Sequence, residues 1–137
     1  MSERIENPDW SLKPPAGWHV REDPDCVACV PSSGEGSLQL SSHRKGGKVS
    51  ETDLLEFAEH HLRDGAPRRS VELGDFKGFE IAYDTDIEAC REWYLRNGVV
   101  LLFVTWTCEL SRAGRLDPQV EASLVTLKVG KTKRARS

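Results

Sequence analysis

The stretch that decides the fold is Arg91–Cys108, REWYLRNGVVLLFVTWTC. Two strand-like runs meet at Asn97-Gly98, and this dipeptide between two such runs is the strongest short signal for a β-hairpin, because both central residues of a type I′ turn need a positive φ. The run Val99–Cys108 is apolar on both of its faces. A strand that is buried on both faces lies in the centre of its sheet. We therefore expect one layer of structure above this strand and another below it.

Further strands are expected on the N-terminal side of this hairpin. Phe79, Ile81 and Tyr83 alternate with Glu80 and Ala82, which is the pattern of a half-buried strand. The same pattern, or a short apolar run, recurs in three earlier segments: Trp18–Val20, Cys26–Val30 and Leu38–Leu40. Short loops join these strands, and short loops connect antiparallel neighbours because parallel neighbours need long crossovers.

Two helices are expected. The first spans Ser50–Asp64, where Ser50 and Asp53 have the spacing of a capping box. The second spans Asp117–Lys128, with Asp117 as N-cap and Pro118 in the first helical position. The sequence thus predicts an α+β fold: a single antiparallel sheet of about six or seven strands with a helix on each face.

Length and charge predict how the chain is organised. Its 137 residues fit one domain. Residues 1–17 are polar and rich in proline, so we expect an irregular lead-in, followed by a single α+β domain over 18–129 and a basic tail over 130–137. From residue 128 onward there are five cations and no acid; taking these from the net charge of −3 leaves −8 for the preceding residues.

Composition also bears on compartment and partners. Residues 1–13 are too charged for a signal peptide, and the longest apolar stretch, Val99–Val104, is too short to span a bilayer. A cytoplasmic protein without a membrane partner is expected, with its four cysteines reduced. Its acidic balance argues against binding nucleic acid.

Several motifs resemble those of a known family. They are Pro15-Ala16-Gly17-Trp18, Gly36-Ser37-Leu38-Gln39-Leu40, the helix with Leu54, Leu55 and Phe57, Gly78-Phe79 and Trp93-Tyr94. With the order of elements, they give a chain that resembles the PsbP-like family from about residue 10 to 129. That family includes lumenal photosystem subunits, Ran-binding nuclear import factors and bacterial DcrB-like proteins. The resemblance implies an accessory protein that binds another protein.

The cysteines and histidines do not form a metal-binding pattern. Cys26 and Cys29 form a C-x-x-C, but residues three apart in a strand face opposite ways, and a zinc site needs a second pair. His60 and His61 diverge by about 100° on their helix, with His61 on its apolar face. We expect packing cysteines, one half-buried and one solvated histidine, and neither metal nor cofactor.

Two clusters of acidic residues fall in expected turns between strands. They comprise Glu22, Asp23 and Asp25 in one turn, and Asp84 and Asp86 in the other. Paired carboxylates catalyse only in a cleft that separates their pKa values, and no assembled catalytic motif occurs. The leading hypothesis is therefore a non-catalytic accessory domain that docks a basic protein partner on these turns.

A basic loop offers an alternative. Arg44, Lys45 and Lys48 precede the first expected helix, and lysines near a helix N-terminus attract anions. The chain would then be a small ligand- or phosphate-binding protein or an enzyme using residues 43–48. A third alternative is a bacterial immunity or secretion chaperone protein made for one partner.

Overall fold

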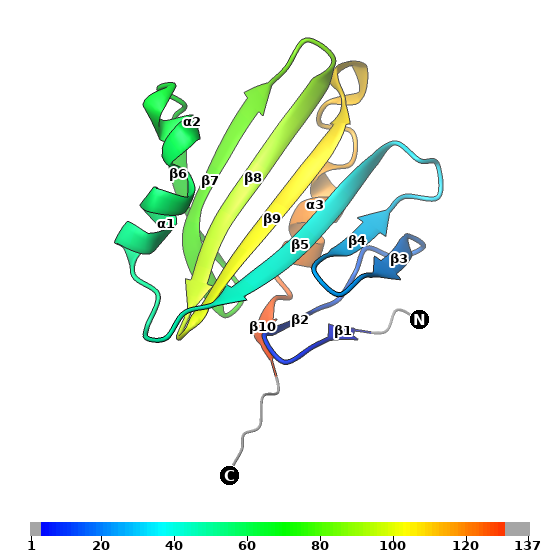
Figure 1. Cartoon of the computed structure of the whole chain (residues 1–137). Helices are drawn as coiled ribbons and strands as arrows, with labels where there is room; N and C mark the ends of the chain where they lie inside the picture. The colour runs from blue at the N-terminus through cyan, green and yellow to red at the C-terminus, as the bar shows by residue number, and fades with distance from the viewer. Residues whose placement is uncertain (1–3, 131–137) are drawn as a thin grey trace.

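A computed structural model describes residues 4–130 of the chain, and Figure 1 shows how its elements are arranged. The main sheet has seven antiparallel strands in the order β3-β4-β5-β9-β8-β7-β6. Their bounds are β3 His19–Glu22, β4 Val27–Val30, β5 Gly36–Arg44, β6 Arg68–Leu73, β7 Phe76–Asp84, β8 Glu88–Asn97 and β9 Val100–Glu109. This confirms the expected fold class.

The strand expected at the centre of the sheet, β9, lies there between β5 and β8. The turn before it is displaced by one residue from its expected place. Asn97 pairs with Val100, so the two turn residues are Gly98 and Val99, and Gly98 has a φ of 56°. This register pairs Leu95 with Leu102, and both side chains are fully buried. The burial of apolar side chains thus fixes the register within the hairpin.

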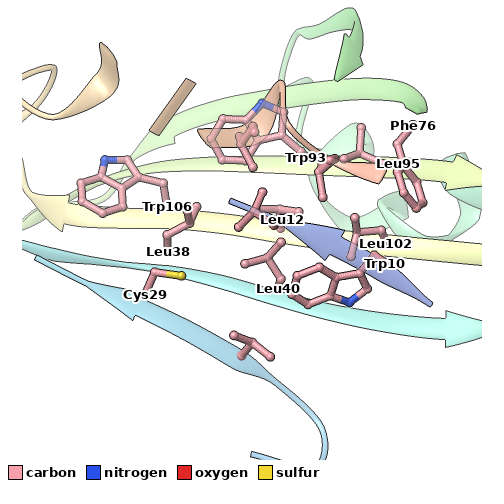
Figure 2. Close-up of a cluster of buried hydrophobic side chains, with 14 of the residues drawn as sticks. Trp10, Leu12, Cys29, Leu38, Leu40, Phe76, Trp93, Leu95, Leu102 and Trp106 are labelled. Atoms are coloured by element: carbon pink, nitrogen blue, oxygen red, sulfur yellow. The ribbon is translucent and has the colours of Figure 1, made fainter. Parts of the chain in front are cut away.

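One face of the sheet carries the larger core (Figure 2). Alternate residues of β8 and β9 point into it, and their Trp93, Leu102 and Trp106 are at most 2% exposed. Helix α3 (Asp117–Leu124) covers this face together with a small sheet, as Figure 1 shows. Because successive side chains of a strand point to opposite faces of the sheet, every second residue of the hairpin is directed into this core.

The small sheet corrects the expectation that residues 1–17 are an irregular lead-in. Its strands are β1 (Ile5–Glu6), β2 (Trp10–Leu12) and β10 (Lys128–Val129), in the order β1-β2-β10. Trp10 and Leu12 are at most 1% exposed, so burial of two large side chains outweighs the local signal of the prolines. The expected basic tail over 130–137 lies outside the described residues except for Gly130.

The ends of α3 also differ from expectation. The helix ends at Leu124 rather than Lys128, because the chain turns there and joins the small sheet. Leu116 is its N-cap, and Asp117 is its first helical residue.

The opposite face of the main sheet is only partly covered. The helix expected over Ser50–Asp64 consists of α1 (Glu51–Phe57) and α2 (Glu59–Arg63), separated at Ala58. Its capping box is confirmed, since Ser50 Oγ accepts from Asp53 N and Asp53 Oδ2 accepts from Ser50 N. Both helices lie over the β6–β7–β8 side, where a second core cluster forms. Within residues 4–130, no helix is long and apolar enough to cross a membrane.

Candidate functional site

The first acidic turn joins β3 to β4 at one edge of the main sheet. Backbone hydrogen bonds close it in both directions, from Asp23 N to Cys26 O at 2.9 Å and from Cys26 N to Asp23 O at 3.4 Å. The turn residues are therefore held by the backbone, and their side chains project outward. Glu22, Asp23 and Asp25 are all exposed, as expected for turn carboxylates.

These carboxylates line a groove of about 370 Å³. Its second wall is the segment that leads into β2, and its floor is the end of β5. The residues of that wall and floor are Asn7, Pro8, Asp9, Trp10, Leu40, Ser41, Ser42 and His43. We call this depression, with Glu22, Asp23 and Asp25 on one wall and Asn7–Trp10 on the other, the acidic groove.

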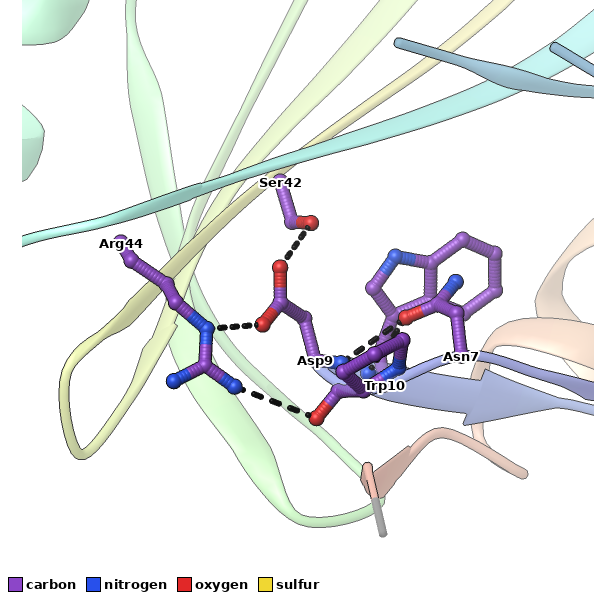
Figure 3. Close-up of polar contacts among 6 residues, drawn as sticks. Asn7, Asp9, Trp10, Ser42 and Arg44 are labelled. Carbon is purple, nitrogen blue, oxygen red and sulfur yellow. Dashed lines mark hydrogen bonds and ion pairs between the residues drawn. The ribbon is translucent and has the colours of Figure 1, made fainter. Parts of the chain in front are cut away.

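Side-chain hydrogen bonds fix the second wall (Figure 3). Asn7 Oδ1 accepts from the backbone N–H groups of Asp9 and Trp10, which is the local turn that asparagine favours. Asp9 then reaches β5: its Oδ2 accepts from Ser42 Oγ at 2.7 Å and its Oδ1 from Arg44 Nε at 2.5 Å. The groove is thus preformed, with one wall tied to its floor.

The charges of the groove are unequally compensated. Asp9 is neutralised by Arg44. Asp23 lies 3.4 Å from Arg21, but the side chains of Asp23 and Arg21 are both more than half exposed. Within residues 4–130, Glu22 and Asp25 make no hydrogen bond or ion pair through their side chains. Two unpaired carboxylates on the wall of a polar groove can accept hydrogen bonds from an ammonium or guanidinium group.

The second acidic turn does not contribute to this groove. It joins β7 to β8 at the opposite end of the sheet, as Figure 1 shows. Asp84 and Asp86 are exposed there, and Thr85 holds the turn by accepting from Glu88 N at 3.0 Å. Ile87, which directly follows Asp86, is 73% exposed. The two acidic turns that the sequence offers for docking a basic partner therefore lie apart on the sheet.

The basic loop is largely occupied by ion pairs. Arg44 binds Asp9, and Lys45 Nζ lies 2.6 Å from Asp53 Oδ2. Hydrogen bonds from Lys45 and from the Ser50 backbone lower the pKa of Asp53, so this carboxylate stays ionised. Lys48 is exposed and makes no ion pair within the described residues. An anion at this loop would have to displace two carboxylates to use all three cations.

The C-x-x-C residues occupy different surroundings. Cys29 is fully buried in the larger core, where burial raises the pKa of its thiol to about 11. Cys26 is half-buried and lines the acidic groove. All four cysteines are free thiols, and no group of three metal-ligating side chains occurs among residues 4–130.

One buried cluster was not expected from the sequence. Glu92, on the helix-covered face, accepts from Tyr83 Oη at 2.7 Å and from Tyr94 Oη at 2.5 Å. Its Oε1 also lies 2.9 Å from His61 Nε2 of α2, which is half-buried while His60 is exposed, as expected. Burial, followed by the Glu92 carboxylate, raises the pKa of both tyrosines. The cluster thus ties α2 to β8.

This cluster gave a weak signal in the sequence. Glu92 is a charged residue inside an apolar strand, and a buried charge requires partners. The segment around Asp9 gave a signal of another kind, because the composition of Asn7-Pro8-Asp9 is typical of a turn.

Comparisons with known proteins identify the fold. No protein-family model and no curated protein matches the chain. Among solved structures, a Bacteroides thetaiotaomicron protein is similar with a TM-score of 0.71 and 14% identity, over 95% of this chain and 49% of that one. LpqN of Mycobacterium tuberculosis, described as involved in cell envelope biogenesis, has a TM-score of 0.59 and 11% identity. The match covers 95% of this chain and 91% of LpqN.

A third similar structure is cyanobacterial PsbP (CyanoP) of Synechocystis, with a TM-score of 0.48 and 12% identity, over 93% of this chain and 91% of that one. The chain spans about half the length of the Bacteroides protein. At these identities the first two likenesses establish a shared fold.

Proposed function

We propose that this chain is a non-catalytic accessory domain that binds a protein partner, and that its acidic groove receives a segment rich in lysine or arginine. The observation that carries the proposal is the pair of unpaired, exposed carboxylates, Glu22 and Asp25, on the wall of a preformed groove. The partner's cation would replace hydration of these carboxylates with charge-assisted hydrogen bonds.

The size of the groove sets the kind of occupant. A volume of about 370 Å³ is near the lower end for ligand sites, so it suits one or two side chains rather than a folded element. Exposed charge pairs contribute little affinity each, but they steer the encounter and raise its rate. We therefore expect weak, fast and salt-dependent binding of an extended basic segment.

The resemblance of the chain to the PsbP-like family supports an accessory role, because members of that family mostly bind other proteins. We include membership of this fold family in the proposal. The cytoplasmic location expected from the sequence stays a prediction.

The test is a titration with a fluorescent peptide of alternating lysine and serine, followed by anisotropy. The groove variant is Asp23→Lys with Asp25→Lys, and the matched control is Asp84→Lys with Asp86→Lys, which changes the net charge equally at the other end of the sheet. We expect the groove variant to bind about tenfold more weakly, which corresponds to about 1.4 kcal/mol. The control variant should lose much less affinity for the peptide, because at 0.15 M salt the interaction between charges more than about 8 Å apart is largely screened.

Circular dichroism confirms that each variant is folded. Equal weakening by the two variants would mean that the peptide responds to net charge and would exclude the groove. A pulldown from native cell extract with the same three baits then shows whether one protein is captured by the wild type and the control and lost with the groove variant.

A further inference from the structure

We propose that two copies of this chain pair through strand β6, so that their main sheets join across a two-fold axis at Ser70. Three observations carry the proposal: the open backbone edge of β6, the order of charges along that edge, and a cavity beside it. Strand β6 lies at the opposite edge of the main sheet from β3 and the acidic groove, as Figure 1 shows. The inference therefore goes beyond the proposed function and does not depend on it.

Strand β6 is an edge strand. Among residues 4–130 it ends the order of the main sheet and pairs only with β7. A two-residue turn joins the two strands, and its closing pair, Leu73 and Phe76, exchanges backbone hydrogen bonds as such pairs do. Because hydrogen-bonded pairs alternate along an antiparallel ladder, Arg68, Ser70 and Glu72 direct their backbone N–H and C=O groups away from β7. All three residues are exposed, and such a row of groups is a template for another strand.

Symmetry limits how two copies of β6 can pair. Opposite residues of an antiparallel pair lie on the same face of the sheet, so in a two-fold dimer one residue of the strand faces its own copy. With Ser70 on the axis, Arg68 of each copy lies opposite Glu72 of the other. A pair centred on Arg69 sets two arginines against each other, and a pair centred on Val71 brings no opposite charges face to face. The charges therefore select the register centred on Ser70.

The side chains of Arg68 and Glu72 are available for these contacts. Within the described part of the chain neither forms an ion pair, and the Arg68 guanidinium lies 5.7 Å from the centroid of the Phe79 ring. The next residue, Arg69, is instead bound to Glu80 on the other face of the sheet. Opposite charges on facing residues stabilise a pair of strands, and like charges destabilise it. A second copy would thus supply a partner of opposite charge to both Arg68 and Glu72.

A cavity of about 480 Å³ lies beside this edge on the helix-covered face. Arg68, Ser70 and Glu72 line one side of it, and Glu51 and Leu54 of α1 line another. With Ser70 on the axis, the cavities of the two copies adjoin. The cavity therefore leaves room for Glu72 of the second copy beside Arg68.

The other edge of the main sheet does not offer a matching register. Strand β3 reads His19-Val20-Arg21-Glu22. A symmetric pair centred on Arg21 sets two arginines against each other, and one centred on Val20 sets His19 against Arg21. Self-association through the main sheet is therefore expected at β6 rather than at β3.

Sedimentation equilibrium over a range of protein concentrations tests the proposal. We expect a reversible monomer–dimer equilibrium for the wild type. Arg68→Glu and Glu72→Arg should each weaken dimerisation about tenfold, because two attractive pairs become repulsive. The first change makes the net charge of −3 more negative and the second makes it less negative, so net charge alone would shift the two dimerisation constants in opposite directions. Arg21→Glu repeats the first charge change on β3 and should leave the dimer intact.

The sharpest arm mixes the two variants. In a dimer of one Arg68→Glu chain with one Glu72→Arg chain, both facing pairs again carry opposite charges. We expect this heterodimer to form with about the affinity of the wild-type dimer, and the double variant Arg68→Glu, Glu72→Arg should restore the homodimer. Circular dichroism confirms that each variant is folded.

Four results would overturn the proposal. They are a wild type that stays monomeric at every concentration, opposite shifts in the two single variants, an equal loss of dimer in Arg21→Glu, and a mixture that forms no heterodimer.

Discussion

Arg44 Nε lies 2.5 Å from Asp9 Oδ1, an ion pair that joins the end of β5 to the entrance of β2. The sequence assigned Arg44 to an anion site and Asp9 to an irregular segment, and the structure uses each to neutralise the other. Because Ser42 Oγ also donates to Asp9, three side chains hold one wall of the acidic groove. The geometry of the groove thus depends on a contact that no local pattern specifies.

We expect Asp9→Ala to lower the free energy of unfolding by about 1–2 kcal/mol. The change removes a charge-assisted hydrogen bond and a hydroxyl contact, although Arg44 is partly exposed and recovers hydration. Chemical denaturation measures the loss, with Asp86→Ala in the exposed hairpin tip as control, where we expect a change within about 0.5 kcal/mol. The Asp9 variant should also bind the basic peptide differently from the wild type, since its groove wall is released. Equal stability of both variants would show that the Asp9 contacts contribute nothing.

Where periodicity and burial agree, the sequence predicted the fold. The β8–β9 hairpin, the central place of β9 and the capping box at Ser50 follow from patterns within about ten residues, and each is found in the structure. The small sheet was not predicted, because its strands are two or three residues long and gain stability only from partners at the other end of the chain. The break of the first helix at Ala58 likewise has no composition signal.

The candidate site was predictable in part. The exposure of Asp23 and Asp25 follows from their place in a turn, while Glu22, which is also exposed, is the last residue of the edge strand β3. Their assembly into a groove requires the Asn7–Trp10 segment, which reaches them through the fold rather than through sequence. For the same reason the two acidic turns could not be placed at opposite ends of the sheet before strand order was known.

The cysteines should differ in reactivity. Burial raises the pKa of Cys29 to about 11 and removes it from solvent, so we expect no reaction with a thiol reagent at pH 7.5 in the folded protein. Cys26 is half-buried in the groove and should react first, although its pKa is also raised by burial. Mass spectrometry after timed alkylation identifies the labelled site, with Cys26→Ser as control. Rapid labelling of Cys29 would show that the β3–β4 edge opens.

We expect Glu92→Ala to destabilise the protein by about 2–4 kcal/mol. The change leaves the hydroxyls of Tyr83 and Tyr94 without their acceptor and removes the contact with His61. Glu56→Ala on the exposed side of α1 is the matched control and should change stability little. Hydrogen exchange should show α2 opening more readily in the Glu92 variant. Unchanged protection of α2 would contradict the view that this cluster ties α2 to the sheet.

The last prediction concerns acid stability and rests on Glu80 and Arg91. Glu80 is 6% exposed and accepts from Arg91 Nε at 2.6 Å and from Arg69 Nη2 at 2.5 Å. Burial alone would raise the pKa of Glu80, but the hydrogen bonds and charges of the two arginines outweigh it and lower the pKa below its usual value. Asp117 and Glu121 also face the Arg91 guanidinium, at 3.3 and 3.0 Å.

A carboxyl group whose pKa is lowered by folding stabilises the protein fully above its unfolded pKa, about 4.3 for glutamate, and this stability is lost as the pH falls through the folded value. We therefore expect Glu80→Gln to cost about 3 kcal/mol at pH 7, because the Arg91 side chain, which is only 13% exposed, keeps its charge but loses one of its three carboxylate partners. The difference between variant and wild type should narrow as the pH is lowered from 5 to 3, since protonation then disables Glu80 in the wild type too. Urea unfolding at pH 7, 5 and 3.5 measures this difference in the free energy of unfolding. Glu72→Gln on the exposed edge strand β6 is the control. A difference that stays constant over this range would mean that Glu80 acts through shape and hydrogen bonding rather than through its charge.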